Sequence, residues 1–257
     1  MNPVFLKISR GLRLILLCGL AAGSLQAYAQ DEAPMLTEAA SFAPAMTPVV
    51  VELFSSQACP FCPAADKLFA GVVAQNAQII GLACHIDYFD VQTNSLSKPF
   101  CTKRQNWYAR VKAVGTNYTP QMVVQGQMDV VGYREEDVGP ALERATTVPV
   151  APLSIAPGER NGHFIVSAPA QVMVSADDIE TTLMLYDKPH DITIAEGRNQ
   201  GTAASYVNIV SALEETDGWE GQLLEVTPNV KDLHKGFAVL VQDKKTGHIL
   251  AAGRYEF

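Results

Sequence analysis

Residues 49–62 read VVVELFSSQACPFC, and the fold can be predicted outward from these residues. The run 49–54 is short, rich in β-branched residues and almost wholly apolar, which is typical of a strand buried on both faces of a parallel sheet. A polar turn follows, and Cys59 and Cys62 then stand three positions apart at the start of a segment with helical spacing of apolar residues. This order predicts a redox-active cysteine pair at the end of a central strand.

The position of Cys59 predicts a reactive thiol. We expect a helix from Pro60 to about Gln75, because proline suits the first helical position. The unpaired amide groups and positive dipole at a helix start stabilise an anion, so the pKa of Cys59 should fall below the roughly 8.5 of a free thiol. Cys62, one turn inside, would resolve a mixed disulfide. An inert disulfide and half of a zinc site are the alternatives, although zinc needs further ligands, usually a second closely spaced pair, and the sequence has no such pair.

The amino-terminal residues 1–29 read as a secretory signal peptide with a basic start, an apolar run at 14–20 and a cleavage site near Ala29. This apolar run is too short to span a bilayer comfortably, and no other stretch approaches the roughly 20 apolar residues that a membrane helix requires. We therefore expect a periplasmic or secreted protein with no membrane span in the mature chain. A lipoprotein anchored through Cys18 is a minor alternative, because the small residue expected before a lipidated cysteine is missing.

The acidic composition argues against nucleic acid as a partner. The 257-residue chain has 19 Lys and Arg against 27 Asp and Glu, a formal net charge of −8. Loss of the signal peptide would remove three basic and no acidic residues and leave −11, which repels a polyanion. The remaining length exceeds one typical domain, and export allows disulfides to persist.

The periodicity of apolar residues predicts an α/β part followed by a β-rich part. After the signal peptide and a flexible lead-in at 30–46, residues 47–148 form a β-α-β-α-β-β-α series, and 149–257 form a sandwich-like β-rich domain. The further elements expected in the first domain are strands at 78–85, 122–125 and 128–131 and helices at 100–114 and 134–145. The runs expected as strands in the second are 164–167, 171–174, 181–186, 192–195, 237–242 and 249–254. Residues 203–213 fit a strand or a short helix.

This order resembles the thioredoxin fold over about residues 47–147. The segment YTPQ at 118–121 adds a third feature, because thioredoxin-like proteins carry a cis-proline before the third core strand, facing the cysteine pair. The resemblance implies that Pro120 shapes the substrate contact, with Thr119 and Phe61 as substrate-binding residues. The strings VELFSSQAC at 51–59, HIDYFD at 85–90 and YTPQMVV at 118–124 are also similar to a family of exported bacterial thioredoxin-like proteins catalogued as a domain of unknown function.

The resemblance also suggests a role for Glu52. Thioredoxins hold a buried acid in the first strand, which accepts a proton from the inner cysteine. Glu52 lies seven residues before Cys59, one more than the usual thioredoxin spacing, and burial would suit its carboxyl group to general-base work. The alternative is an edge-facing or salt-bridged glutamate.

Cys84 and Cys101 form a second pair of cysteines. A bridge between them would close a loop of about 16 residues, which chain-entropy arguments value at about 3 kcal/mol, so we predict a structural disulfide. Two unpaired buried thiols and a relay that exchanges with Cys59 and Cys62 are the alternatives.

The leading functional prediction is an exported thiol–disulfide oxidoreductase without a cofactor. It would exchange disulfides with protein or small-molecule thiols and disulfides and with a redox partner protein. A copper or zinc chaperone is one alternative, with Cys59, Cys62 and His85 as ligands. Strand alternation puts the side chains of the adjacent Cys84 and His85 on opposite faces, which argues against both of them binding one metal ion. A non-catalytic thioredoxin-like binding module is the other alternative.

Overall fold

The computed structural model describes residues 47–89, 95–112, 116–168, 178–217 and 223–257. The predicted signal peptide, the lead-in at 30–46 and the strand expected at 171–174 lie outside these residues. Contacts within the chain gather Ala43–Phe257 into one compact unit, and the division after residue 148 stays a prediction. In the described ranges, no helix combines the length and the apolar character that a membrane crossing requires.

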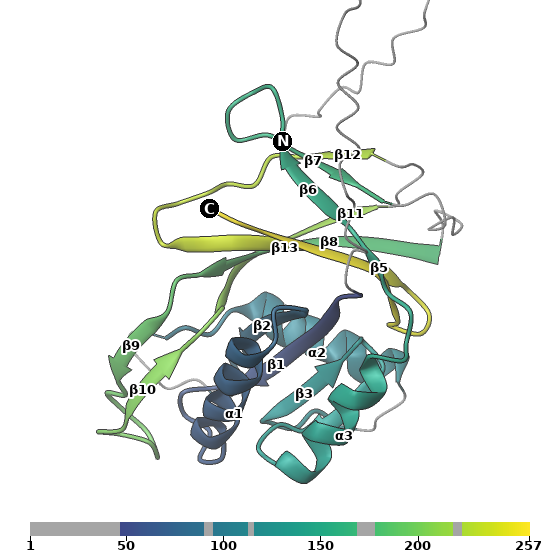
Figure 1. Cartoon of the computed structure of the whole chain (residues 1–257). Coiled ribbons are helices and arrows are strands. Elements are labelled where there is room, and N and C mark those ends of the chain that lie inside the picture. The colour runs from purple at the N-terminus through teal and green to yellow at the C-terminus, as the bar shows by residue number, and fades with distance from the viewer. Residues whose placement is uncertain (1–46, 90–94, 113–115, 169–177, 218–222) are drawn as a thin grey trace, which may run out of the picture. The chain divides into compact units, whose positions relative to one another are not determined.

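The first half of this unit contains a four-stranded mixed sheet in the order β2-β1-β3-β4. The strands are β1 (Val49–Ser55), β2 (Ile79–His85), β3 (Gln121–Val124) and β4 (Met128–Val131). The helices are α1 (Cys62–Gln75), α2 (Pro99–Val111) and α3 (Glu135–Ala145). β2 runs parallel to β1, whereas β3 pairs antiparallel with both β1 and β4. This series confirms the predicted thioredoxin-like order, and Figure 1 shows the helices around the sheet.

Side chains of β1 alternate between two apolar cores. Val51 and Leu53 pack with residues of α1 and α3 in one core. Val50 and Phe54 point to the other face, where Tyr108 of α2 and residues of the second half of the chain cover them. Burial on both faces explains why the strand is apolar without a polar alternation. Glu52 is the exception, and by alternation it shares the face of Val50 and Phe54.

The second half of the unit consists of strands. They are β5 (Ala151–Pro152), β6 (Ser154–Pro157), β7 (Phe164–Ser167), β8 (Ile179–Asp187), β9 (His190–Thr193), β10 (Ala203–Tyr206), β11 (Val210–Asp217), β12 (Leu223–Val226), β13 (His234–Asp243) and β14 (Ile249–Glu256). They form a five-stranded sheet in the order β11-β8-β13-β14-β5, a three-stranded sheet β12-β7-β6 and a two-stranded ribbon β10-β9. The segment 203–213, which fitted a strand or a helix, contains β10 and the start of β11.

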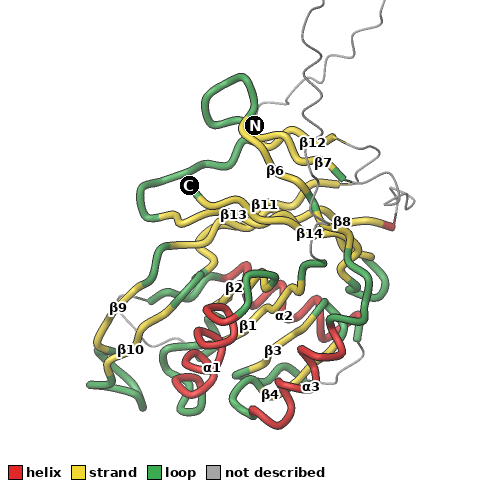
Figure 2. Tube along the Cα trace, in the orientation of Figure 1, coloured by secondary structure: helices red, strands yellow, loops and turns green. Residues whose placement is uncertain are grey.

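The five-stranded sheet is buried on both faces. Met184 and Tyr186 of β8 pack into the core shared with the first sheet. Leu183 and Leu185 point the opposite way, into the core shared with the three-stranded sheet. Figure 2 shows the five-stranded sheet between the three-stranded sheet and the α/β part. The β-rich half is therefore sandwich-like, as predicted, and its inner sheet also completes the core of the first half. Each fully buried Leu side chain contributes roughly 1.5–3 kcal/mol to this packing.

The ribbon β9-β10 leaves the sheets and lies beside α1 (Figure 1). Tyr206 of β10 meets the buried ring of His85 edge-on, with the ring centres 5.0 Å apart. Asn208, just beyond β10, donates a hydrogen bond to the carbonyl of Gly81 in β2 at 3.0 Å. These contacts hold the ribbon so that the loop at its tip lies near the end of β1.

Candidate functional site

The cysteine pair lies in the turn between β1 and α1. The helix begins at Cys62, two residues later than predicted, with Phe61 as its N-cap and Pro63 in its first turn. Proline is tolerated there because its missing N–H would be unpaired in any case. Cys59 precedes the helix in a tight turn, which the Cys62 amide closes by donating to the Cys59 carbonyl at 3.2 Å.

The two thiols differ sharply in acidity. Donation from the Cys62 thiol lowers the pKa of Cys59 to about 7, although burial opposes this shift, and the backbone amides of Phe61 and Cys62 lower the pKa further. Burial raises the pKa of Cys62, and its interactions with Cys59 raise it again. Cys59 is therefore the thiol that ionises near neutral pH, and Cys62 keeps its proton.

The segment before β3 faces Cys59. The peptide bond between Thr119 and Pro120 is cis, and Pro120 is buried. The Sγ atom of Cys59 lies 3.5 Å from the carbonyl oxygen of Thr119. The hydroxyl of Tyr88 is hydrogen-bonded to that of Thr119 and donates to Gln105 at 3.1 Å. The structure thus brings together Cys59, Thr119 and Pro120, which the resemblance grouped at one site.

A buried acid also reaches the cysteines, and it is Asp66 rather than Glu52. Asp66 lies four residues after Cys62 and therefore on the same face of α1. Its side chain is 7% exposed, and one of its carboxylate oxygens has no hydrogen-bond partner among the described residues. Burial raises the pKa of Asp66 to about 7; the nearby Ser55 hydroxyl opposes the shift, and the charge of Cys59 adds to it. The sequence predictions did not include Asp66, although its spacing of one helical turn from Cys62 is a signal that could have pointed to it.

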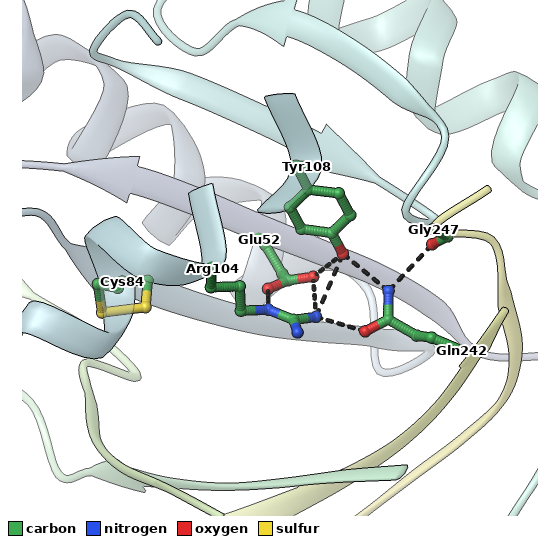
Figure 3. Close-up of polar contacts among 7 residues, drawn as sticks. Glu52, Cys84, Arg104, Tyr108, Gln242 and Gly247 are labelled. Carbon is green, nitrogen blue, oxygen red and sulfur yellow. Dashed lines mark hydrogen bonds and ion pairs between the residues drawn. A yellow bond between two sulfur atoms is a disulfide. The ribbon is translucent and has the colours of Figure 1, made fainter. Parts of the chain in front are cut away.

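Glu52 lies on the opposite face of the sheet, so the structure does not bring it to Cys62. Its carboxylate accepts hydrogen bonds from the Nε and Nη2 atoms of Arg104, the latter at 2.8 Å, and from the hydroxyl of Tyr108 (Figure 3). The physical reason is alternation along β1: Ser55 shares the face of α1, whereas Glu52 shares that of α2. Glu52 is therefore a salt-bridged glutamate, which was the alternative to a general base.

The Glu52 network connects the two halves of the unit. Arg104 donates to Gln242 of β13 at 2.6 Å, and Gln242 donates to the hydroxyl of Tyr108 and to the carbonyl of Gly247, both at 3.0 Å (Figure 3). Burial works against the charge of Arg104, but the adjacent Glu52 raises its pKa above the usual value. The network therefore holds a paired charge at the junction of α2, β1 and β13.

The second cysteine pair is a disulfide. Cys84 at the end of β2 and Cys101 at the start of α2 are bonded, with their Cα atoms 5.3 Å apart. Both are fully buried in the core on the Glu52 face. The bridge therefore holds the start of α2 in place, in agreement with the predicted structural disulfide. Among the residues the structure describes, no group of three or more His, Cys, Asp and Glu side chains could hold a metal ion. Cys59, Cys62 and His85, the ligands of the alternative metal site, therefore do not form such a group.

An open cavity of about 500 Å³ adjoins the cysteine turn, where Cys59 is 1% exposed and Cys62 is fully buried. Its lining residues are Ala58, Cys59, Pro60, Phe61, Phe89, Thr119, Gly197 and Arg198. Phe61 is 58% exposed and stacks on Tyr133, and Phe89 is 46% exposed. Phe61 and Thr119, the expected substrate-binding residues, thus lie at one cavity. Gly197 and Arg198 come from the β9-β10 loop, about 140 residues further along the chain, and no local pattern pointed to them.

The sequence profile of a family described as "Protein of unknown function (DUF1223)" matches residues 50–242, three quarters of the chain. The chain belongs to the DUF1223 family. The DUF1223 match runs from β1 into β13 and so includes both the cysteine turn and the loop that lines its cavity. No curated protein is similar enough in sequence to count as a relative.

Two solved structures resemble this DUF1223 chain. One is the X-ray structure of protein AGR_C_4864 from Agrobacterium tumefaciens, with a TM-score of 0.64 and 22% identity over 81% of this chain and 93% of that one. The other is HBP35 of Porphyromonas gingivalis, with a TM-score of 0.59 and 13% identity over 82% of this chain and 76% of that one. At these identities the similarity concerns the fold alone.

Proposed function

We propose that this DUF1223 protein is a thiol–disulfide oxidoreductase in which Cys59 attacks and Cys62 resolves. The observation that carries this proposal is the position of Cys59, which is one of the residues that line an open cavity of about 500 Å³ and whose sulfur faces the Thr119 carbonyl, although only 1% of the residue is exposed. A lowered pKa of about 7 at Cys59 supports the assignment of the attacking sulfur, because the thiolate is the nucleophile in disulfide exchange.

In the first step, the Cys59 thiolate attacks one sulfur of a substrate disulfide. A bond forms between Cys59 and that sulfur, the substrate disulfide breaks, and the second substrate sulfur leaves as a thiolate that takes a proton from water. The Cys62 thiol and the backbone amides that stabilise the Cys59 anion are in place before the substrate arrives, so no reorganisation is needed at this step.

In the second step, Cys62 loses its proton and attacks the Cys59 sulfur of the mixed disulfide. The bond between Cys59 and the substrate breaks, the second substrate thiolate is released, and Cys59 and Cys62 become a disulfide. We assign the proton of Cys62 to Asp66, because Asp66 is one helical turn away and its pKa of about 7 suits a general base near neutral pH. Asp66 also lines a second cavity of about 300 Å³ beside Ala203 and Ser205, which offers the proton a way to solvent.

The reaction leaves the substrate with two more electrons and two more protons, and an external dithiol must reduce the cysteine pair before the next cycle. The reverse sequence would donate a disulfide. We place this chemistry in the periplasm or outside the cell, because the predicted signal peptide and the buried disulfide of Cys84 and Cys101 both suit an oxidising compartment.

The test is reduction of insulin by purified protein with dithiothreitol as the electron donor. Wild-type protein should accelerate the reaction catalytically, Cys59→Ser should lose this activity, and Cys62→Ser should accumulate a mixed disulfide that mass spectrometry detects on Cys59. The matched control is a variant with Cys84 and Cys101 both replaced by serine. Its folded form should keep Cys59-dependent turnover. Equal rates for the wild type and Cys59→Ser would reject the proposal.

A further inference from the structure

A loop from the β-rich half forms one wall of the cysteine cavity. Residues 194–202 connect β9 to β10. Two backbone hydrogen bonds of 2.9 Å close the loop: the amide of Ile194 donates to the carbonyl of Thr202, and the amide of Gly201 donates to the carbonyl of Ile194. Gly197 and Gly201 have φ values of 82° and 83°, a conformation that favours glycine. The loop thus has a defined shape, and Gly197 and Arg198 at its tip line the cavity beside Cys59.

Asn199 fixes this loop to the backbone of the cysteine turn. Its side chain is buried, and its Nδ2 atom donates hydrogen bonds to the carbonyl oxygens of Gln57 at 2.9 Å and of Cys59 at 2.7 Å. The backbone of the neighbouring Arg198 is therefore held close to the cysteine turn, although about 140 residues separate Arg198 from Cys59 in the chain.

The cavity has a positively charged side chain, although the chain as a whole is acidic. Arg198 is exposed and is the one basic side chain among the eight described residues that line the cavity, where the Cys59 thiol is the other ionisable group, whereas the whole chain has a formal net charge of −8. The other lining side chains are mainly apolar or small, with Phe61 and Phe89 as the large ones. A guanidinium group in such surroundings complements a carboxylate, to which it can donate two parallel hydrogen bonds, and the two phenylalanines complement a hydrocarbon segment.

We infer that Arg198 forms a subsite for a carboxylate of the substrate, so that the protein prefers anionic disulfides whose carboxylate lies within a few bonds of the reacting sulfur. This inference rests on the proposed function. It assigns to the β9-β10 loop the selection of substrates, while Cys59 and Cys62 perform the exchange. Arg198 binds and orients the substrate and holds the carboxylate beside Cys59, which favours attack on the adjacent sulfur.

Three small disulfides that differ chiefly in their end groups test the inference. They are 3,3′-dithiodipropionate, which is anionic, bis(2-hydroxyethyl) disulfide, which is neutral, and cystamine, which is cationic. The measurement is kcat/KM with dithiothreitol regeneration at low ionic strength, and each variant is compared with the wild type on the same disulfide so that intrinsic reactivity cancels. Arg198→Gln should lower kcat/KM about tenfold on the anionic disulfide, leave it within about twofold on the neutral one and raise it on the cationic one. High salt should shrink these differences.

Arg160→Gln is the matched control, because it removes the same charge from an exposed arginine that pairs with Glu225, at 3.6 Å, outside the cavity. It should change none of the three rates by more than about twofold. Equal losses on all three disulfides in Arg198→Gln, or equal effects of the two variants, would overturn the inference. Cys59-dependent turnover of the neutral disulfide without charge selection rejects the subsite alone, whereas turnover that does not depend on Cys59 rejects the proposed function.

Discussion

The two faces of β1 hold buried acids in opposite ways. On one face, Glu52 is fully engaged by Arg104 and Tyr108, and the network continues to Gln242 in the second half of the chain. On the face of α1, Asp66 has an oxygen without a partner among the described residues and a pKa raised to about 7 by burial. A buried charge whose hydrogen-bond and ion-pair partners are all present stabilises a junction. A buried acid that lacks a hydrogen-bond partner is suited to take up a proton. The comparison separates a structural acid from a candidate functional one on the same strand-helix unit.

Loss of the Glu52 carboxylate should destabilise the protein more than any other substitution considered. Glu52→Gln leaves the buried guanidinium of Arg104 without its counter-charge, so the free energy of unfolding should fall by about 3–5 kcal/mol. Urea denaturation followed by circular dichroism measures this change. Glu225→Gln, which breaks an exposed ion pair with Arg160, is the control and should cost less than about 1 kcal/mol. Similar losses in the two variants would remove the distinction between the buried network and the surface.

Asp66→Asn, the corresponding substitution of the other buried acid, should have the opposite effect on the free energy of unfolding. Because the pKa of Asp66 is raised when the protein folds, the folded state binds a proton more tightly than the unfolded state, and stability falls as the pH rises from about 4 to about 7. Asp66→Asn removes this loss, so the variant should be at least as stable as the wild type at pH 8.

Asp66→Asn should instead slow the second step of the exchange. Loss of the proton acceptor should lower the rate at which Cys62 resolves a preformed mixed disulfide on Cys59 by about 10²-fold, which corresponds to about 2.7 kcal/mol. Stopped-flow release of a chromogenic thiol from Cys59 measures this step, and the rate of mixed-disulfide formation is the internal control. A resolving rate equal to that of the wild type would exclude Asp66 as the acceptor.

Substitution of Cys62 should change the acidity of Cys59 by a smaller amount. Its thiolate fraction should be half at a pH of about 7 and should decrease below that pH. Cys62→Ala removes the hydrogen bond that lowers the pKa most and should move the midpoint up by about one unit, or 1.4 kcal/mol, whereas Cys62→Ser keeps a donor and should move it less. The pH dependence of iodoacetamide alkylation measures both midpoints. Identical midpoints in the two variants would assign the acidity of Cys59 to the backbone amides alone.

Local patterns predicted much of the first half of the chain. The apolar run of β1 indicated a strand buried on both faces, and the structure places α1 and α3 on one face and α2 with the five-stranded sheet on the other. The cysteine turn and the Thr119-Pro120 segment could be assigned because each is contiguous and has a characteristic order in the chain. The exact start of α1 could not, since Pro60 and Pro63 both suit a first helical turn and only the structure shows that the helix begins at Cys62.

Local sequence was sufficient to predict the strand, the cysteine pair and the segment that faces it, because these features depend on the spacing of neighbouring residues and on side-chain chemistry. Only the folded structure shows that Asp66 rather than Glu52 lies on the side of Cys62, and that Arg198 lines the cavity beside Cys59. A carboxylate is as apt for a salt bridge as for proton transfer, and the face on which it lies selects between the two. Contacts across about 140 residues, such as that of Asn199 with Cys59, arise because the β9-β10 ribbon lies beside α1, which leaves no local pattern in the chain.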